Sequence, residues 1–276
     1  MPKTAVKLGT IQETLLVPLW ARARESEEAQ PVLHDPKSRE ILASLDYDFS
    51  PLDGARASQL GCCVRGAQVD RWVRAFLNDF PEGTVIELGV GLNSRFERVD
   101  NGRARWFELD LPDAMDLRRQ FFEDTDRRTL ISGSALDDDW LAQVRAESRG
   151  PWFIASEGVL VYFHPEEVRA LFARMADALP GGLFAYDSMT PLVLRHQRRH
   201  DAMRYFEAEF TWSVSNAREV EFWDDRYQIL DARSFYSMLY AHPRRLPAYY
   251  RYLGPLLGAV YPPLKRAYHV NLMRLG

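Results

Sequence analysis

The sequence is poor in cysteine, since its 276 residues include only Cys62 and Cys63, which are adjacent. Two neighbouring thiols with no other cysteine exclude a disulfide framework and a cysteine-based zinc site. We therefore expect both side chains to be buried as small hydrophobic groups. This cysteine usage is typical of a reducing compartment, and we expect the protein in the cytoplasm.

The sequence also lacks a long uninterrupted apolar segment. Gln12 and Glu13 break the N-terminal apolar region, so we expect no signal peptide. The longest apolar stretch, 246–264, contains Arg251 and four prolines, a composition that excludes a membrane-spanning helix. We therefore expect no membrane partner.

An excess of positive charge is missing as well. The sequence has 35 Lys and Arg against 39 Asp and Glu, a net charge of −4, which argues against a nucleic-acid-binding protein. Aromatic residues, by contrast, are abundant: 15 Phe, 12 Tyr and 7 Trp. They can fill an ordinary core, or they can line a pocket for a flat small molecule.

The first 80 residues predict helices. Apolar residues recur at helical spacing in 12–29 and in 63–80, and Asp35-Pro36 opens a short helix that should end near Leu45. We expect residues 1–80 to form a helical cap or lid on a core made of residues 81–276, the two forming one integrated domain.

From Thr84 onward, short apolar runs alternate with helical patterns, which predicts an α/β fold with an open parallel sheet covered by helices on both faces. The predicted strands are 84–88, 104–109, 129–132, 151–156 and 182–187, and the predicted helices between them are 112–122 and 165–179. A helical insertion is expected at about 190–260, with a helix at 191–210, a possible strand at 210–214, helices through 231–258, and a terminal strand at 268–275.

The segment ELGVGLNSR (87–95) directly follows the first predicted strand. Its glycines allow a sharp turn and close approach of a ligand, and a doubly wound sheet binds nucleotide-like ligands at this edge. A dinucleotide fingerprint needs a third glycine where this sequence has Ser94. The motif therefore favours a cofactor without a diphosphate.

Acidic residues follow the other strands. Asp110 lies 19 residues beyond Gly91, where a carboxylate can accept hydrogen bonds from both ribose hydroxyls. Leu136 and Asp137 follow the third strand and could flank an adenine ring, although Asp137 could equally cap a helix. Glu157 leaves a buried strand and therefore needs a partner, such as the positive centre or amino group of a cofactor.

These motifs resemble the leucine carboxyl methyltransferase family, in particular its bacterial branch. The resemblance rests on ELGVGLNSR, ELD (108–110), GSALD (133–137) and SEGVLVYF (156–163). It implies S-adenosylmethionine as methyl donor, with S-adenosylhomocysteine as product. It also implies a Rossmann-like class I methyltransferase fold, with a mostly parallel, seven-stranded, doubly wound sheet and an N-terminal helical cap.

The resemblance also implies roles for individual residues. Arg65 would hold the methionine carboxylate, Gly89 would pack beside the methionine portion, and Asp110 would bind the ribose. Leu136 and Asp137 would flank the adenine, and Glu157 would contact the amino acid end. Gly91 and Asn93 are further candidates for cofactor binding. Members of the branch often have Asp-Thr where this sequence has Asn93-Ser94. Asn93 keeps an acceptor but lacks the charge, and we expect cofactor binding to survive.

The acceptor is less constrained. A carboxylate is already ionised at pH 7 and needs no base, whereas a phenol needs one. We favour an aromatic or polyketide-like small-molecule carboxylate. The alternatives are a protein C-terminus and a methyltransferase fold repurposed as a non-methylating cyclase or binding protein.

No metal is expected, because His196 and His200 have no evident third ligand. His164 is the histidine nearest the predicted active edge, and we favour an exposed position before Pro165 over a role as base. Aromatic candidates for the substrate pocket, each explained equally well by core packing, are Trp20, Phe121, Tyr162, Phe163, Tyr205, Trp212 and Trp223.

Overall fold

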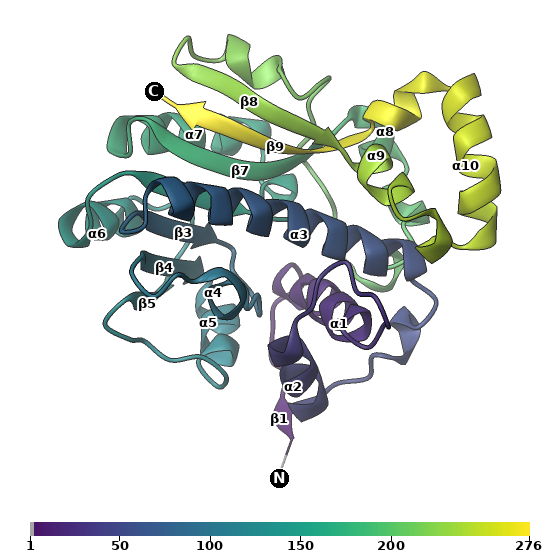
Figure 1. Ribbon diagram of the computed structural model, residues 1–276, viewed down its shortest axis with the longest axis horizontal. Coiled ribbons are helices and arrows are strands. Elements are labelled where there is room, and N and C mark those ends of the chain that lie inside the picture. Colours follow the sequence, from purple (N-terminus) through teal and green to yellow (C-terminus); the bar gives the residue numbers. More distant parts are fainter. Residues whose placement is uncertain (1–2) are drawn as a thin grey trace.

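The computed structural model describes residues 3–276 and is built around a seven-stranded sheet (Figure 1). Its strand order is β5-β4-β3-β6-β7-β9-β8, and only β9 runs antiparallel to its neighbours. The strands are β3 (Thr84–Leu88), β4 (Arg105–Asp110), β5 (Arg128–Ser132), β6 (Trp152–Ser156), β7 (Gly182–Met189), β8 (Tyr227–Ser234) and β9 (Tyr268–Leu275). The predicted α/β fold with a mostly parallel sheet is confirmed, as is the terminal strand.

Helices cover both faces of this sheet. The helices are α1 (Leu16–Glu25), α2 (Pro36–Ser44), α3 (Arg56–Asp79), α4 (Arg95–Val99), α5 (Pro112–Arg118), α6 (Asp139–Glu147), α7 (Pro165–Ala178), α8 (Pro191–Arg195), α9 (Phe235–Tyr240) and α10 (Ala248–Val260). Strands β1 (Thr4–Ala5) and β2 (Leu45–Asp46) form a separate parallel pair.

The two faces of strand β3 show why the sheet is buried between helices. Val85 packs in the cluster of α3, whereas Ile86, the next residue along the strand, packs in the cluster of α6 and α7. Successive side chains of a strand point to opposite faces, so an apolar run is what a strand covered on both sides requires. Helix α3 lies across the sheet (Figure 1) and begins at Arg56, seven residues before the predicted helix.

Helices α1 and α2 are held to the sheet by buried charges. Asp35 caps α2 by accepting the amide of Ser38 at 3.0 Å. The same carboxylate pairs with Arg22 of α1 at 2.9 Å and with Arg98 of α4 at 3.0 Å. It also accepts the hydroxyl of Ser94, in the loop after β3, at 2.6 Å. One buried carboxylate therefore joins the N-terminal helices to the end of the central strand.

The segment between β7 and β9 differs from the prediction. Only α8 and two 3-10 turns form where a helix was expected at 191–210, because this stretch is rich in charged residues and α8 buries none of its side chains. Residues 210–214 form no strand of the sheet, although the amide of Val214 donates to the carbonyl of Met189. The alternation of apolar and polar residues that suggested a strand here arises because Trp212 and Val214 are buried and their neighbours are less so. Strand β8 lies where only helices were expected.

No helix in residues 3–276 is both long enough and apolar enough to span a lipid bilayer.

Candidate active site

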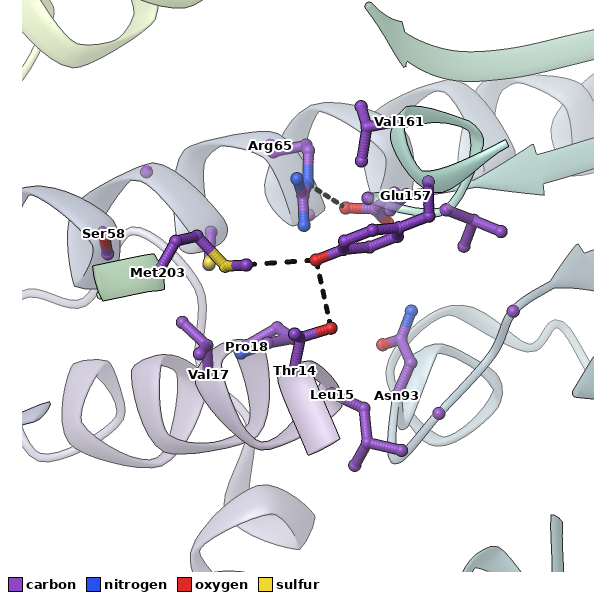
Figure 2. A pocket seen from close by; sticks show the side chains of 18 of the residues that line it. Thr14, Leu15, Val17, Pro18, Ser58, Arg65, Asn93, Glu157, Val161 and Met203 are labelled. Atoms are coloured by element: carbon purple, nitrogen blue, oxygen red, sulfur yellow. Dashed lines mark hydrogen bonds and ion pairs between the residues drawn. The ribbon is translucent and has the colours of Figure 1, made fainter. Parts of the chain in front are cut away.

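A cavity of about 650 Å³ lies at the carboxyl ends of β3, β4 and β6. Its walls come from the first turns of α1, from α3, from the loops after these strands, and from the segment 189–268. Figure 2 shows Arg65 and Glu157 on one side, Thr14 and Leu15 on another, and Met203 reaching into the same space. The volume suits a nucleoside-sized ligand and a second small molecule together.

The loop after β3 forms a glycine turn beneath the cavity. Gly89 and Gly91 have φ angles of +65° and +50°. A β-carbon on Gly89 would lie 2.2 Å from Cγ2 of Val159, so that position has no room for a side chain. Both glycines line the cavity, and the turn would bring the backbone close to a ligand there. Their contact with the cofactor stays a prediction.

Asp110 stands at the carboxyl end of β4 and lines the cavity. Its carboxylate accepts the amides of Gly91 at 2.6 Å and of Leu111 at 2.8 Å. Burial raises the pKa of Asp110 above its usual range, although these two amides act to lower it. The two amides fix the carboxylate and leave acceptor capacity for two further donors.

Asn93 bridges opposite charges at the end of the glycine turn. Its amide nitrogen donates to Glu87 at 3.2 Å, and its oxygen accepts from Arg98 at 3.1 Å. A carboxylate in place of this amide nitrogen would face Glu87 and repel it. The departure from Asp-Thr at 93–94 is therefore matched to its surroundings.

Glu157 lies in a buried network at the cavity wall. It accepts from Nε of Arg65 at 3.2 Å and forms a close ion pair with Arg95. Burial acts to raise the pKa of Glu157, but Arg95 and Arg65 hold it below its usual range. Nη1 of Arg65 donates to Asp187 at 2.9 Å and to the hydroxyl of Tyr268 at 3.1 Å. Arg65 lines the cavity, and its Nη2 makes no hydrogen bond within residues 3–276.

The loop after β5 contributes one of its two predicted residues. Leu136 lines the cavity. Asp137 is exposed and outside the cavity lining, and its carboxylate accepts the amide of Ser134 at 3.3 Å. Helix α6 begins two residues later, at Asp139.

The far half of the cavity is apolar and aromatic. Tyr162 projects into it and donates its hydroxyl to Thr14 at 3.1 Å, and burial raises the pKa of Tyr162 to about 12. Phe163 also lines the cavity. This wall also includes Met189, Val193, Phe210, Phe235, Leu239, Tyr240, Leu246, Tyr250 and Leu264.

The other aromatic candidates do not line this cavity, and their placement there was wrong. Trp20 and Trp212 are buried in core clusters, and Trp223 packs against the cluster that holds Trp212. Phe121 packs against the cluster beneath α1 and α5, and Tyr205 is exposed. The sequence pattern does not reveal whether a large aromatic side chain enters a core or the cavity. Four of these five side chains pack in or against core clusters, and Tyr205 is the exception.

His164 is exposed, caps α7 and lies outside the cavity lining, in agreement with the interpretation that we favoured. His200, which we considered only together with His196 as a metal ligand, lines the cavity. Its Nδ1 accepts the amides of Ala202 and Met203 at 3.4 and 3.2 Å, and burial lowers its pKa. These contacts place the proton of the neutral ring on Nε2. The helix that should have joined His196 to His200 ends at Arg195.

Four further residues of the site were missed: Glu87, Arg95, Asp187 and Tyr268. Asp187 ends the predicted strand 182–187, so its place at the same edge as Glu157 could have been noticed. Tyr268 lies beside the site because β9 pairs antiparallel with β7, with Tyr268 opposite Met189. That register has no local signal in the sequence.

Comparisons with known proteins place this geometry in context. A model of the leucine carboxyl methyltransferase family matches residues 16–176. The tetracenomycin polyketide synthesis O-methyltransferase TcmP of Streptomyces glaucescens is 31% identical over 217 residues, covering 78% of this chain and 80% of that protein. The S-adenosyl-L-methionine-dependent methyltransferase dpfgK of Gibberella zeae is 29% identical over 241 residues, covering 80% and 81%.

Among solved structures, a DUF574 family protein from Streptomyces avermitilis is similar with a TM-score of 0.56 and 13% identity, over 93% of this chain and 97% of that one. At this identity the likeness concerns the fold alone.

Proposed function

This chain belongs to the leucine carboxyl methyltransferase family, and we propose that it methylates a carboxylate of an aromatic or polyketide-like small molecule. S-adenosylmethionine is the methyl donor: it supplies an electrophilic methyl group and leaves as S-adenosylhomocysteine. A relative named for polyketide synthesis and O-methylation supports the substrate class.

The residues at the strand ends fit this donor. The fixed carboxylate of Asp110 has acceptor capacity for the ribose hydroxyls, and Leu136 offers an apolar wall to the adenine. The uncommitted edge of Arg65 would pair with the methionine carboxylate, and Glu157 with the amino group. Gly89 and Gly91 line the cavity, and the turn that they form would let the backbone approach the donor closely.

One observation supports a carboxylate acceptor over a phenol. The groups in the apolar, aromatic part of the cavity that could act as a base already accept hydrogen bonds from the protein. Nδ1 of His200 accepts two backbone amides. The carboxylate of Asp201 accepts the amides of Ala57 and Ser58 at the start of α3, at 3.1 and 3.3 Å. Burial raises the pKa of the Cys62 thiol. Among the described residues of this wall, none is set to deprotonate a phenol.

A carboxylate acceptor needs no such group, because it is ionised at pH 7. The protein then has to orient the acceptor oxygen in line with the methyl group and exclude water, which can lower the barrier by about 7–11 kcal/mol. The apolar wall also favours a small hydrophobic acid over the polar end of a polypeptide.

The test is a panel of aromatic acids and matched phenols, assayed with S-adenosylmethionine carrying a labelled methyl group. Methyl esters are hydrolysed by mild alkali, whereas methyl ethers are stable. We expect labelled product from the acids, and we expect alkali to release the label as methanol. An alkali-stable product formed from the phenols would overturn the proposal. His164→Ala provides a control outside the cavity and should keep full activity.

A further inference from the structure

Helix α10 is apolar on nearly all sides and yet exposed. Of its thirteen residues only Gly258 is buried and only Arg251 is charged. Tyr252, Leu256 and Val260 expose 72%, 61% and 75% of their surface. Figure 1 shows α10 at the edge of the molecule, beside α9 and away from the sheet. A helix that is hydrophobic on all sides is normally covered by other protein or by lipid.

One side of α10 is explained by its contact with α9. Gly254 and Gly258 face Tyr240 and Tyr236, and β-carbons built on these glycines would lie 1.5 and 2.9 Å from the two phenol oxygens. The hydroxyl of Tyr236 donates to the carbonyl of Gly254 at 3.2 Å. This contact packs the glycine side of α10 against α9. The exposed side of α10 carries Tyr252, Leu253, Leu256, Leu257 and Val260.

The segment that contains α10 carries charges of one sign only. Residues 232–276 contain no Asp or Glu, although the whole chain has a net charge of −4. Their seven cations are Arg233, Arg244, Arg245, Arg251, Lys265, Arg266 and Arg274. Arg245 is paired with Glu25 at 2.6 Å, but Arg244, Lys265 and Arg266 are exposed at the two ends of the helix.

We propose that the outer face of α10 docks onto the interface of an anionic lipid bilayer. Apolar and tyrosine side chains would enter the headgroup boundary, and the cations at both ends of the helix would meet the phosphates. A second copy of this chain is a poorer partner, because its cations would face those of the first. This inference departs from our expectation of no membrane partner, which rested on the lack of a membrane-spanning segment.

The same arm adjoins the cavity. Leu246, Tyr250 and Leu264 flank or belong to α10 and also line the cavity wall. A hydrophobic acid dissolved in the bilayer would therefore meet the protein beside the acceptor half of the cavity. Membrane docking is measured without substrate, so its test is independent of the proposed methylation.

The experiment is co-sedimentation of the full chain with vesicles of phosphatidylcholine, with and without phosphatidylglycerol. We expect binding to the anionic vesicles to be about tenfold or more tighter than to the neutral ones, and to weaken with added salt. The double variant Leu256→Glu, Val260→Glu should lose binding by a similar factor. Phe222→Glu, at a residue 88% exposed outside α10, is the matched control and should bind as the wild type does.

Equal affinity of the wild type for both vesicles, or no sedimentation with either, would overturn the proposal, and this comparison does not depend on how the variants fold. Light scattering gives a further outcome. A wild-type dimer that the double variant abolishes, with no vesicle binding, would assign the face to a second copy and also overturn it. Unchanged affinity of the double variant for S-adenosylhomocysteine verifies that its site is intact.

Discussion

The carboxylate of Asp110 is held in a fixed orientation by the backbone. Two backbone amides hold its oxygens at 2.6 and 2.8 Å, so binding of the proposed ribose would cost little conformational entropy at this side chain. Its position at the end of β4 follows from the strand pattern, whereas its orientation follows from the turn at Gly91.

We predict that Asp110→Asn weakens binding of S-adenosylhomocysteine by about 100-fold, because the amide nitrogen would face a backbone amide and cannot accept from the ribose. Calorimetry measures this affinity. Asp116→Asn, an exposed change on α5, is the control. Burial raises the pKa of Asp110, so wild-type affinity should fall as the pH is lowered from 7 toward 4. Unchanged affinity of the variant would contradict the placement of the ribose.

Gly89 offers a test of the glycine turn. We predict that Gly89→Ala destabilises the protein by about 1–3 kcal/mol more than Gly102→Ala, as measured by urea unfolding. Both glycines have positive φ, but a β-carbon at Gly102 meets nothing within 4 Å, whereas one at Gly89 meets Val159 at 2.2 Å. The pair therefore separates close contact from backbone strain. Equal losses would show that Val159 moves away without cost.

At the scale of elements, Asp35 joins α1 and α2 to the end of β3. We predict that Asp35→Asn lowers the free energy of unfolding by about 3 kcal/mol at pH 7, because Arg22 loses its charged partner in a buried site. Asp46→Asn changes an exposed carboxylate of the same region and should cost little. Urea unfolding of both variants measures the difference.

The difference in unfolding free energy between wild type and Asp35→Asn should depend on pH, and the direction of this dependence can be predicted. Burial acts to raise the pKa of Asp35, but Arg22 and Arg98 hold it well below its usual range. A carboxylate with a lowered folded-state pKa stabilises the protein above its unfolded-state pKa of about 4. The difference between wild type and Asp35→Asn should therefore shrink as the pH falls below 4. A difference that does not change with pH would contradict the ion pair.

The contact between α9 and α10 lies beside the part of the cavity where we propose that the acceptor binds. We predict that Gly254→Ala raises the KM for the acceptor and leaves the affinity for S-adenosylhomocysteine unchanged. The new β-carbon would displace the phenol of Tyr240, which lines the cavity. Gly54→Ala, where a β-carbon has open space, serves as control. An unchanged KM would show that Tyr240 does not contact the acceptor.

An element could be predicted from the sequence when its burial leaves a clear pattern of apolar residues. Strands such as β3 are covered on both faces and appear as continuous apolar runs. Strand β8 lies at the sheet edge and exposes every second residue in its first half, so its pattern was taken as part of a helical region. Helix α10 satisfies helical spacing, but nothing in the local pattern reveals that its apolar side chains are exposed.

At the scale of the whole molecule, the cavity joins segments that are far apart in the chain. Residues at strand ends, such as Asp110 and Glu157, were predicted because parallel strands bring their carboxyl ends to one edge. Pairings such as Arg65 with Asp187 and Tyr268 depend on how α3 and β9 pack on the sheet. Most of the aromatic candidates for the substrate pocket were misassigned, because core clusters and the cavity are lined by similar side chains.

The proposed carboxylate acceptor needs no base, and the dependence of kcat/KM on pH tests this most directly. With an aromatic carboxylic acid as acceptor, we predict that kcat/KM is level between about pH 6 and 9, because the acid is fully ionised throughout. A rise of about tenfold per pH unit across this range would mean that a proton must leave before the methyl group is transferred, and it would contradict a carboxylate acceptor that needs no base.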